Sequence, residues 1–323
     1  MQGNRGILCV GLACVDFVNV VNEYPKEDSD QRGSDYYWQR GGNASNNCTV
    51  LSLLSVPCEF VGVLGSQGAE ARWIANDFAT CGINISHSVV KDVLCPVATI
   101  ILNVGTGTRT ILFYPRDRPE LSYAEFHDIF KDDFSSFSWT HFELCSNVSE
   151  ISSMLDDVIR YNNSLKNDDV VVDDKVFISV EIEKPEFSGY DSVMTKADLL
   201  FVSKDYAKSQ GFTDASCAVN KLSSLCKPNA VVVCAWGDEG AAASYKGQTL
   251  TSAALRGVKV IDSLGAGDTF VAGFMSVLWR EQYLHKYTLT DCRLIIQQAL
   301  DFACKLAGLK CSMFGYKGLK DYC

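Results

Sequence analysis

The sequence has no excess of positive charge and no long apolar run. Its 29 lysines and arginines are outnumbered by 39 aspartates and glutamates, for a net charge of −10. A protein that binds nucleic acid needs clustered Lys and Arg to contact phosphates, so this class is excluded. No apolar stretch approaches the roughly 18 residues that a membrane-spanning helix requires. We therefore expect neither nucleic acid nor a membrane among the partners of this protein.

Residues with metal-ligating spacing are also missing. Only four histidines are present, and none of the 14 cysteines forms a Cys-x-x-Cys pair, so a zinc site is not expected. The cysteines lie in apolar contexts, as free thiols do in a reducing cytosol. The one candidate signal peptide, residues 7–21, is interrupted by Gly11 and Asp16 and is more typical of a strand. We expect a cytoplasmic protein.

What is present is a regular alternation of apolar runs and helical patterns. Continuous apolar strands separated by helices indicate an α/β protein, with a mostly parallel central sheet flanked by helices in three layers, α/β/α. Ligands of such sheets bind beyond the carboxyl ends of the strands. The expected strands are residues 7–13, 59–64, 140–144, 176–183, 199–202 and 231–235. The expected helices are residues 44–54, 69–81, 149–161, 214–226, 268–280 and 291–308, and residues 166–175 are expected to form a polar loop.

Two segments, residues 17–39 and 96–115, do not follow this succession of strands and helices. Their alternating residues are typical of strands joined in hairpins. The stretch VATIILNVGTGTRTILFYP consists of two β-rich runs joined by a glycine turn, which predicts a hairpin. We expect a small β-sheet lid, formed by about residues 15–40 and 96–116, on a single domain that spans residues 1–323.

The stretch DSLGAGDTF, residues 262–270, is a glycine turn that opens a helix. The unpaired amides and the dipole at such a helix start favour a bound anion, yet Asp268 places a carboxylate there. A dinucleotide fingerprint is not matched, because Phe270 takes the place of its third glycine. No Walker motif and no H-R-D catalytic loop occur in the sequence.

A second glycine motif, RGGNASNN, lies at residues 40–47. Gly42 permits a close backbone approach, and Asn43 and Asn46 offer both donors and acceptors. Together with Asp16, these groups suit a polyhydroxyl ligand, since each hydroxyl both donates and accepts. The structural alternative is that Asn43 caps a helix and Asp16 is a polar strand edge.

The two motifs, each opening a helix, resemble those of the ribokinase-like (PfkB) carbohydrate kinases, and the resemblance runs over essentially the whole chain. ILCVGL, YPKEDS, WQRGGNASN, VEIEKP and FVSKD are most similar to the members that transfer the γ-phosphoryl group of ATP to the C1 hydroxyl of D-fructose. The resemblance implies a ribokinase-like fold, a carbohydrate kinase and fructose 1-phosphate as the product. The alternatives are a sibling kinase that acts on ribose, adenosine or the O6 of fructose, and a non-catalytic sugar- or nucleotide-binding relative.

The resemblance also implies roles for the motif residues. Asp268 matches the catalytic base, which takes a proton from the attacking hydroxyl, and the helix dipole is expected to favour its ionised form. The anion hole and the sugar contacts are implied as follows: Gly265, Ala266 and Gly267 for the anion hole; Asp16, Gly42, Asn43 and Asn46, with Asp268, for the sugar.

The nucleotide site is implied at three places. Arg109 in the lid hairpin and Lys204 after a strand match residues that reach phosphates, although each could equally be a solvated surface side chain. The loop that matches the adenosine site contains Trp236, Gly237, Asp238 and Gly240, with Cys304 and Cys311 on the opposite wall. Small residues on that wall are equally what helix packing needs.

Two departures from the family pattern limit these assignments. Ser203-Lys204-Asp205-Tyr206 stands where many members carry Asn-x-x-Glu, so Mg²⁺ is expected to arrive with ATP and no protein ligand is assigned. Cys145 stands where an arginine is expected, which makes Glu143 a candidate supporting contact. The resemblance further implies a monovalent cation, K⁺, near the anion hole and a homodimer formed through the edges of the lid.

Overall fold

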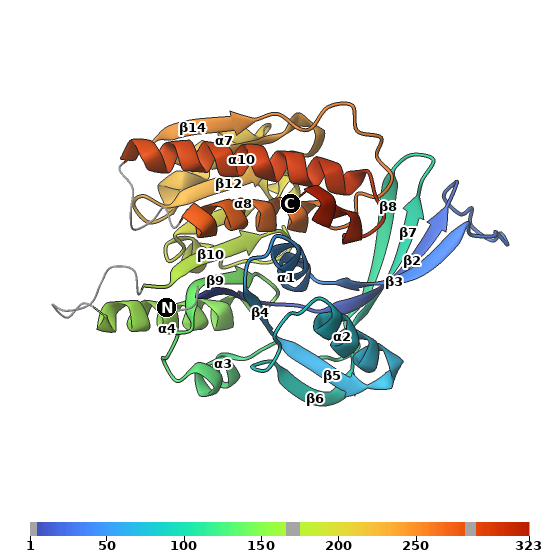
Figure 1. Cartoon of the computed structure of the whole chain (residues 1–323), viewed down its shortest axis with the longest axis horizontal. Helices are drawn as coiled ribbons and strands as arrows, with labels where there is room; N and C mark the ends of the chain where they lie inside the picture. Colours follow the sequence, from blue (N-terminus) through green and yellow to red (C-terminus); the bar gives the residue numbers. More distant parts are fainter. Residues whose placement is uncertain (1–4, 166–174, 282–288, 323) are drawn as a thin grey trace.

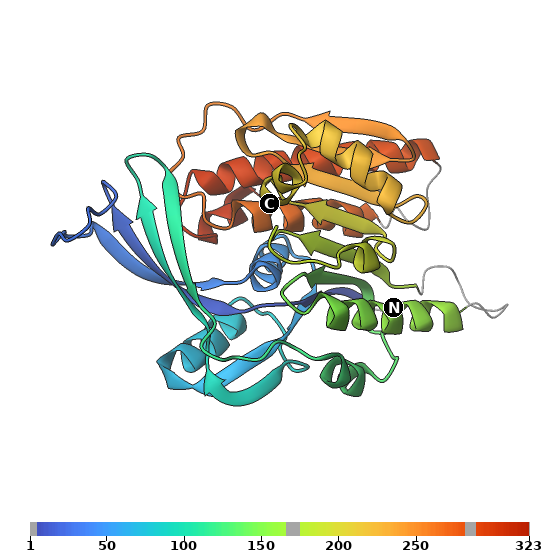
Figure 2. The same cartoon turned by 180° about the vertical axis from the view of Figure 1, so that it is seen from behind.

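The computed structural model describes residues 5–165, 175–281 and 289–322. Its strands form an eight-stranded sheet, a four-stranded sheet and a two-stranded sheet. Helices cover both faces of the largest sheet, and the four-stranded sheet projects from one end of the molecule (Figures 1 and 2). The polar loop expected at residues 166–175 lies outside the described residues except for Lys175.

The large sheet has the order β14-β13-β12-β11-β10-β9-β1-β4. The six strands from β12 to β4 are parallel, as predicted, whereas β13 and β14 form an antiparallel extension. The extension was not predicted, because β13 is mostly alanine, a residue with little intrinsic preference for strands. The bounds are β1 (Gly6–Val10), β4 (Cys58–Val61), β9 (Phe137–Glu143), β10 (Phe177–Ile182), β11 (Leu199–Val202), β12 (Val231–Ala235), β13 (Ala241–Tyr245) and β14 (Gln248–Ser252).

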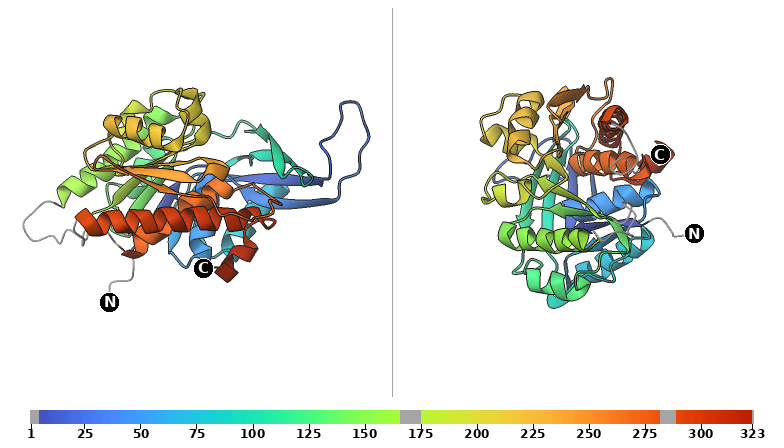
Figure 3. Two further views of the ribbon diagram at one scale, coloured as in Figure 1. Left: turned by 90° about the horizontal axis from the view of Figure 1, so that it is seen from above. Right: turned by 90° about the vertical axis from the view of Figure 1, so that its left-hand side faces the viewer.

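Two hydrophobic cores lie on the two faces of this sheet, and the right-hand view of Figure 3 shows helices on both sides of it. Strand β1 contributes side chains to both cores, because successive side chains of a strand point to opposite faces. Ile7 and Cys9 belong to one core, and Leu8 and Val10 belong to the other. The helices are α1 (Asn43–Leu53), α2 (Gly68–Thr80), α3 (Tyr123–Phe130), α4 (Val148–Ser164), α5 (Asp191–Met194), α6 (Lys204–Ser209), α7 (Ala215–Leu222), α8 (Ala266–Glu281) and α10 (Leu289–Cys311), with short 3-10 turns at Ser223–Leu225, Gly237–Glu239 and Lys317–Tyr322.

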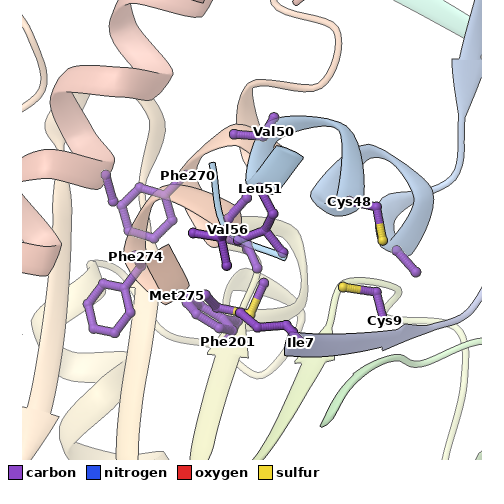
Figure 4. Close-up of a cluster of buried hydrophobic side chains, with 14 of the residues drawn as sticks. Ile7, Cys9, Cys48, Val50, Leu51, Val56, Phe201, Phe270, Phe274 and Met275 are labelled. Carbon is purple, nitrogen blue, oxygen red and sulfur yellow. The ribbon is translucent and has the colours of Figure 1, made fainter. Parts of the chain in front are cut away.

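The first core packs α1 against α8 over the sheet (Figure 4). Leu51 of α1 and Phe274 and Met275 of α8 are fully buried there, and burial of each such side chain contributes about 1.5–3 kcal/mol. This packing matters for function because each helix begins at one of the two glycine motifs.

The strand predicted at residues 59–64 is wrong in its extent. It breaks at Gly62 into β4 and β5 (Val63–Gln67), and β5 pairs with β6 (Val89–Leu94) in the two-stranded sheet. A side chain at position 62 would overlap the carbonyl oxygen of Gly11. The close approach of these two backbones therefore ends β4 although the apolar run continues.

The four-stranded sheet has the order β3-β2-β7-β8 and consists of β2 (Cys14–Val21), β3 (Asp35–Gly41), β7 (Val97–Asn103) and β8 (Thr108–Tyr114). Both irregular β segments predicted from the sequence thus meet in one separate sheet. Its own small core includes Leu264, which belongs to the DSLGAGDTF turn. This contact places the turn against the small sheet.

Two observations bear on the composition-based expectations. No described helix is long and apolar enough to cross a membrane. Every cysteine that the structure describes is a free thiol, as the apolar contexts predicted.

Candidate active site

The DSLGAGDTF turn leads into α8, which begins at Ala266. Gly265 has a φ of 75°, in the left-handed region that favours glycine. The Ala266 amide donates to the carbonyl of Ser263 at 3.3 Å, while the amides of Gly265 and Gly267 have no acceptor among the described residues. Unpaired amides at a helix start are a ready site for an anion.

Asp268 lies in the first turn of α8 and is buried. The side-chain amide of Asn46, from α1, donates to its Oδ2 at 2.7 Å. The packing of α1 against α8 therefore joins residues 222 positions apart, one from each motif.

The pKa of Asp268 is raised well above its usual range, first by burial and then by the nearby charges of Glu181 and Glu183. The helix dipole is expected to favour the ionised form, but it is the smaller of the two effects here. The dipole is worth about 1 kcal/mol or less at most sites, whereas removing a carboxylate from water costs several times that. The side chain of Asn46 opposes the shift only in part.

Asp16 lies on β2 of the small sheet and is also buried. Burial raises its pKa to about 7. Gly41 of β3 lies directly beside its carboxylate, where a side chain would overlap the oxygens of Asp16. Gly42 has a φ of 94°, and a side chain there would overlap the carbonyl of Leu12. Both glycines of the motif are therefore required by the local packing.

Asn43 is the first residue of α1, and Gly42 occupies the cap position without a side-chain cap. The alternative that Asn43 caps the helix is therefore wrong. Its side-chain amide instead donates to the Oε1 of Glu181 at 3.0 Å and to the Oε2 of Glu183 at 2.9 Å. These carboxylates come from the end of β10 and the residue after it, at the carboxyl edge of the sheet.

Glu143, at the end of β9, ties the start of α1 to the end of β1. Its Oε2 accepts hydrogen bonds from the amides of Leu12 at 2.9 Å and Ala44 at 3.0 Å. Burial raises the pKa of Glu143 to about 7, although both amides act in the opposite direction. The neighbouring Cys145, in place of the expected arginine, is a thiol whose pKa is raised well above its usual range, chiefly by burial.

A buried ion pair between Asp262 and Lys310 anchors the DSLGAGDTF turn to α10. The ammonium of Lys310, from α10, lies 2.6 Å from the Oδ2 of Asp262 and donates to its backbone carbonyl at 3.0 Å. The other carboxylate oxygen of Asp262 accepts the amide of Leu264 at 2.8 Å. Neither charged side chain is exposed. Nothing in the sequence pattern singled out Lys310, because it lies 48 residues from its partner.

Arg109, on β8, reaches the turn from the small sheet. Its guanidinium donates to the hydroxyl of Ser263 at 3.1 Å. The structure thus brings Arg109 to the turn that bears the unpaired amides. Cys311 lies behind the same turn, where its carbonyl accepts the amides of Ile261 and Asp262.

The remaining predicted nucleotide residues form a separate group beyond the end of β12. Lys204 donates to the carbonyl of Trp236 at 3.2 Å and lies 3.4 Å from the carboxylate of Glu239. Gly237 and Gly240 have positive φ values and bound the short 3-10 turn that contains Asp238. A cavity of about 300 Å³ opens beside them, lined by Trp236, Glu239, Asp214, Ala215, Ser216, Ala241, Ala242, Thr251, Ser252 and Ala253.

Cys304 does not line this cavity. It is 6% exposed and lies behind Ser252, with its thiol 3.9 Å from the carbonyl of that residue. The structure therefore places Cys304 behind a residue that lines the cavity and not on the cavity wall itself. The residues that line the cavity on that side come from β14 and the segment after it, which the sequence pattern did not suggest.

The raised carboxyl pKa values predict an unusual pH dependence of stability. Folded Asp16, Glu143 and Glu181, the last with a pKa raised to about 8 by burial, hold protons that the unfolded chain releases near pH 4. The folded state therefore binds more protons than the unfolded state up to about pH 8, so the free energy of unfolding should fall as the pH rises from about 6.5 to about 8. Below about pH 6.5, His141 acts in the opposite direction. Burial lowers its pKa to about 3, so at this residue the folded state binds fewer protons than the unfolded state.

Denaturant unfolding measured in steps across pH 6.5–8 tests this expectation. Glu143→Gln keeps an acceptor for both amides but removes one titrating group. The free energy of unfolding of this variant should therefore fall less steeply with pH than that of the parent. A free energy of unfolding that rises with pH across this window would contradict the expectation.

Comparison with known proteins identifies the class. Residues 4–318 match the family model described as pfkB family carbohydrate kinase, and the chain belongs to this family. The sequence is 39% identical over 317 residues to the ketohexokinase of Mus musculus, covering 98% of this chain and 99% of that protein. The protein is a PfkB carbohydrate kinase and a homologue of ketohexokinase.

Solved structures show the same fold. A ribokinase from Giardia lamblia superposes with a TM-score of 0.78 at 17% identity, over 97% of this chain and 95% of that chain. A fructokinase from Xylella fastidiosa with bound ATP gives a TM-score of 0.72 at 19% identity, over 98% and 95%. The predicted ribokinase-like α/β fold, with its separate small sheet, is confirmed.

Proposed function

We propose that this kinase transfers the γ-phosphoryl group of ATP to the C1 hydroxyl of D-fructose, giving fructose 1-phosphate. The single observation that carries the proposal is the pairing of Asp268 with Asn46 at the helix start that bears the unpaired amides. The identity to a ketohexokinase over nearly the whole of both chains supports the choice of substrate.

In this mechanism Asp268 accepts the proton of the attacking hydroxyl as the new O–P bond forms. Its raised pKa makes the ionised carboxylate a stronger base than an exposed aspartate, which favours proton transfer. The amides of Gly265 and Gly267 stabilise the negative charge on the transferring group. Arg109, beside Ser263, adds a positive charge on the same side.

Sugar binding is assigned to Asp16, Asn43 and Asn46 with Asp268, around the backbone of Gly42. The carboxylates of Glu181 and Glu183 orient the amide of Asn43 and leave its carbonyl oxygen to accept from a sugar hydroxyl. The adenosine of ATP is assigned to the cavity beside Trp236. Lys204, Gly237, Asp238 and Gly240 border it.

Magnesium is expected to arrive with ATP, held by its phosphates and by water, where it would offset phosphate charge. Among the described residues, the one cluster with metal-ligand spacing is His127 of α3, Asp132 of the loop after α3, and Asp157 of α4. Arg160 already pairs with both aspartates there, so this cluster does not fit an active-site magnesium. A K⁺ ion does not fit at Asp262, because the ammonium of Lys310 occupies both its carboxylate and its carbonyl.

A homodimer formed through the small sheets is part of the proposal. The edge strand β8 exposes four consecutive apolar side chains, each nearly half exposed: Ile111, Leu112, Phe113 and Tyr114. An uncovered apolar edge strand pairs readily with another strand, and a second copy offers the same edge. Sedimentation equilibrium at micromolar concentration should give twice the chain mass, and a monomer mass would contradict this part of the proposal.

The function is tested by incubating the protein with Mg-ATP and fructose, ribose or adenosine. Consumption of ATP with fructose, and NMR of the product showing phosphate on C1, is the expected result. Phosphate on C6, or turnover with only ribose or adenosine, would establish a sibling activity. Fructose binding without ATP consumption would indicate a binding protein.

A further inference from the structure

A buried hydroxyl without a partner lies beside the reactive turn. Tyr316 follows α10 and is 6% exposed, and its hydroxyl makes no hydrogen bond with any described residue. That hydroxyl lies against Gly265, at the point where a side chain of residue 265 would begin. A buried polar group without a partner costs stability, so its presence here calls for a ligand that pairs with it.

Tyr316 lies close to several charged groups of the turn and the small sheet. Burial, and then the carboxylates of Asp268, Asp16 and Asp262, raise the pKa of its hydroxyl well above the usual range. The ring of Tyr316 lies 5.7 Å from the ammonium of Lys310, while its hydroxyl lies against Gly265.

A second unpartnered group lies next to it. Gln39 is 8% exposed, and neither its amide nitrogen nor its oxygen has a hydrogen-bond partner among the described residues. It pairs directly with Asp16 in the ladder between β2 and β3, so both side chains stand on the same face of the sheet. The Gln39 oxygen lies beside Gly315, the residue before Tyr316.

The side-chain oxygen of Asn46 is likewise buried and unpartnered. Asn46 already belongs to the proposed sugar site through its bond to Asp268. The unpartnered groups of three separate elements thus gather around the same two carboxylates, which is the arrangement that a ligand with several hydroxyl groups would satisfy.

We propose that the Tyr316 hydroxyl and the Gln39 amide hydrogen-bond hydroxyl groups of the bound sugar other than the one that is phosphorylated, and so help to set sugar specificity. This inference rests on the proposed sugar kinase function and extends it to two residues outside both glycine motifs. A site built to pair with a hydroxyl discriminates against an analogue that lacks it, because the protein groups are then left unpaired.

The test uses Tyr316→Phe and Gln39→Met, which remove the polar groups while nearly keeping their shape. Tyr245→Phe is the matched control, since Tyr245 is also buried but lies at the end of β13, level with the start of β12. Sugar affinity is measured by calorimetry without ATP, and kcat and KM are measured with it, for fructose and for analogues that each lack one hydroxyl.

We expect Tyr316→Phe and Gln39→Met each to weaken fructose binding by about 3–10-fold, the usual worth of one neutral hydrogen bond. The analogue that lacks the contacted hydroxyl should bind the variant and the parent equally well. The thermal unfolding of Tyr316→Phe should match or exceed that of the parent, because the lost hydroxyl had no internal partner.

Equal affinity of parent and Tyr316→Phe for every sugar, or a loss spread evenly over all analogues together with lowered stability, would overturn the role of Tyr316. The same outcomes apply to Gln39→Met. The ratio of variant to parent sugar affinity is measured with whichever sugar the parent phosphorylates. Failure of the parent to phosphorylate any sugar would instead overturn the proposed function, so the two failures are distinguishable.

Discussion

Asp268→Asn is expected to lower turnover about 10²–10⁴-fold, the range for loss of a general base, while sugar binding stays roughly intact. The substitution preserves the shape of the side chain and its ability to accept the hydrogen bond from Asn46, which spans 2.7 Å in the parent. It removes the group that can take the proton from the attacking hydroxyl. The expected change is therefore in kcat, with little change in the affinity for the sugar.

Single-turnover kinetics and calorimetry of sugar binding measure the two quantities separately. Asp301→Asn is the matched control, because Asp301 is an exposed carboxylate on α10, and it should leave turnover unchanged. Near-normal turnover of Asp268→Asn would remove Asp268 from the mechanism. Loss of binding without loss of kcat would assign Asp268 to the sugar alone.

Lys310→Met is expected to lower the free energy of unfolding by about 3–5 kcal/mol, the usual cost of leaving one partner of a buried ion pair uncompensated. Asp262 is fully buried, so its carboxylate cannot recover water when the ammonium is removed. Because the same carboxylate holds the amide of Leu264, the turn that carries the anion hole should loosen and turnover should fall as well.

Chemical denaturation of the parent and of three variants tests this effect. Lys305→Met, an exposed lysine of the same helix, should change the free energy of unfolding by no more than about 0.5 kcal/mol. The double variant Asp262→Asn/Lys310→Met removes the stranded charge and should regain part of the stability. A loss for Lys310→Met no larger than that for Lys305→Met would show that the ion pair does not stabilise the turn.

Much of the fold follows from the residue pattern. Strands such as Leu199–Val202 and Val231–Ala235 coincide with their predictions, because strands buried on both faces must be continuously apolar. The break at Gly62 and the alanine strand β13 could not be predicted in this way. Both depend on which backbone lies alongside, and a single sequence does not state that.

The candidate active site, like the fold, could be predicted from the sequence only in part. The two glycine motifs identified Asn46 and Asp268 as candidates, and Asp16 was added from its place near the first strand. Their residue types suggested a polyhydroxyl ligand, while the role of Asp268 as a base came from the resemblance to the family. The partners of the motif side chains were not predictable. The carboxylate of Glu181 accepts from the side-chain amide of Asn43, 138 positions away in the sequence, and neither local pattern indicates this contact.

The sequence by itself determined the parallel α/β class of this protein, because hydrophobic periodicity is a local property of a chain, and its two glycine motifs were enough to show the resemblance to the PfkB family. Only the tertiary structure decided the electrostatics of the site. Burial overrides the helix dipole at Asp268, Lys310 supplies a cation to Asp262, and Tyr316 brings an unpaired hydroxyl to the turn. The dielectric surroundings of a side chain, and the charges near it, are set by residues distant in sequence that packing brings within a few ångströms.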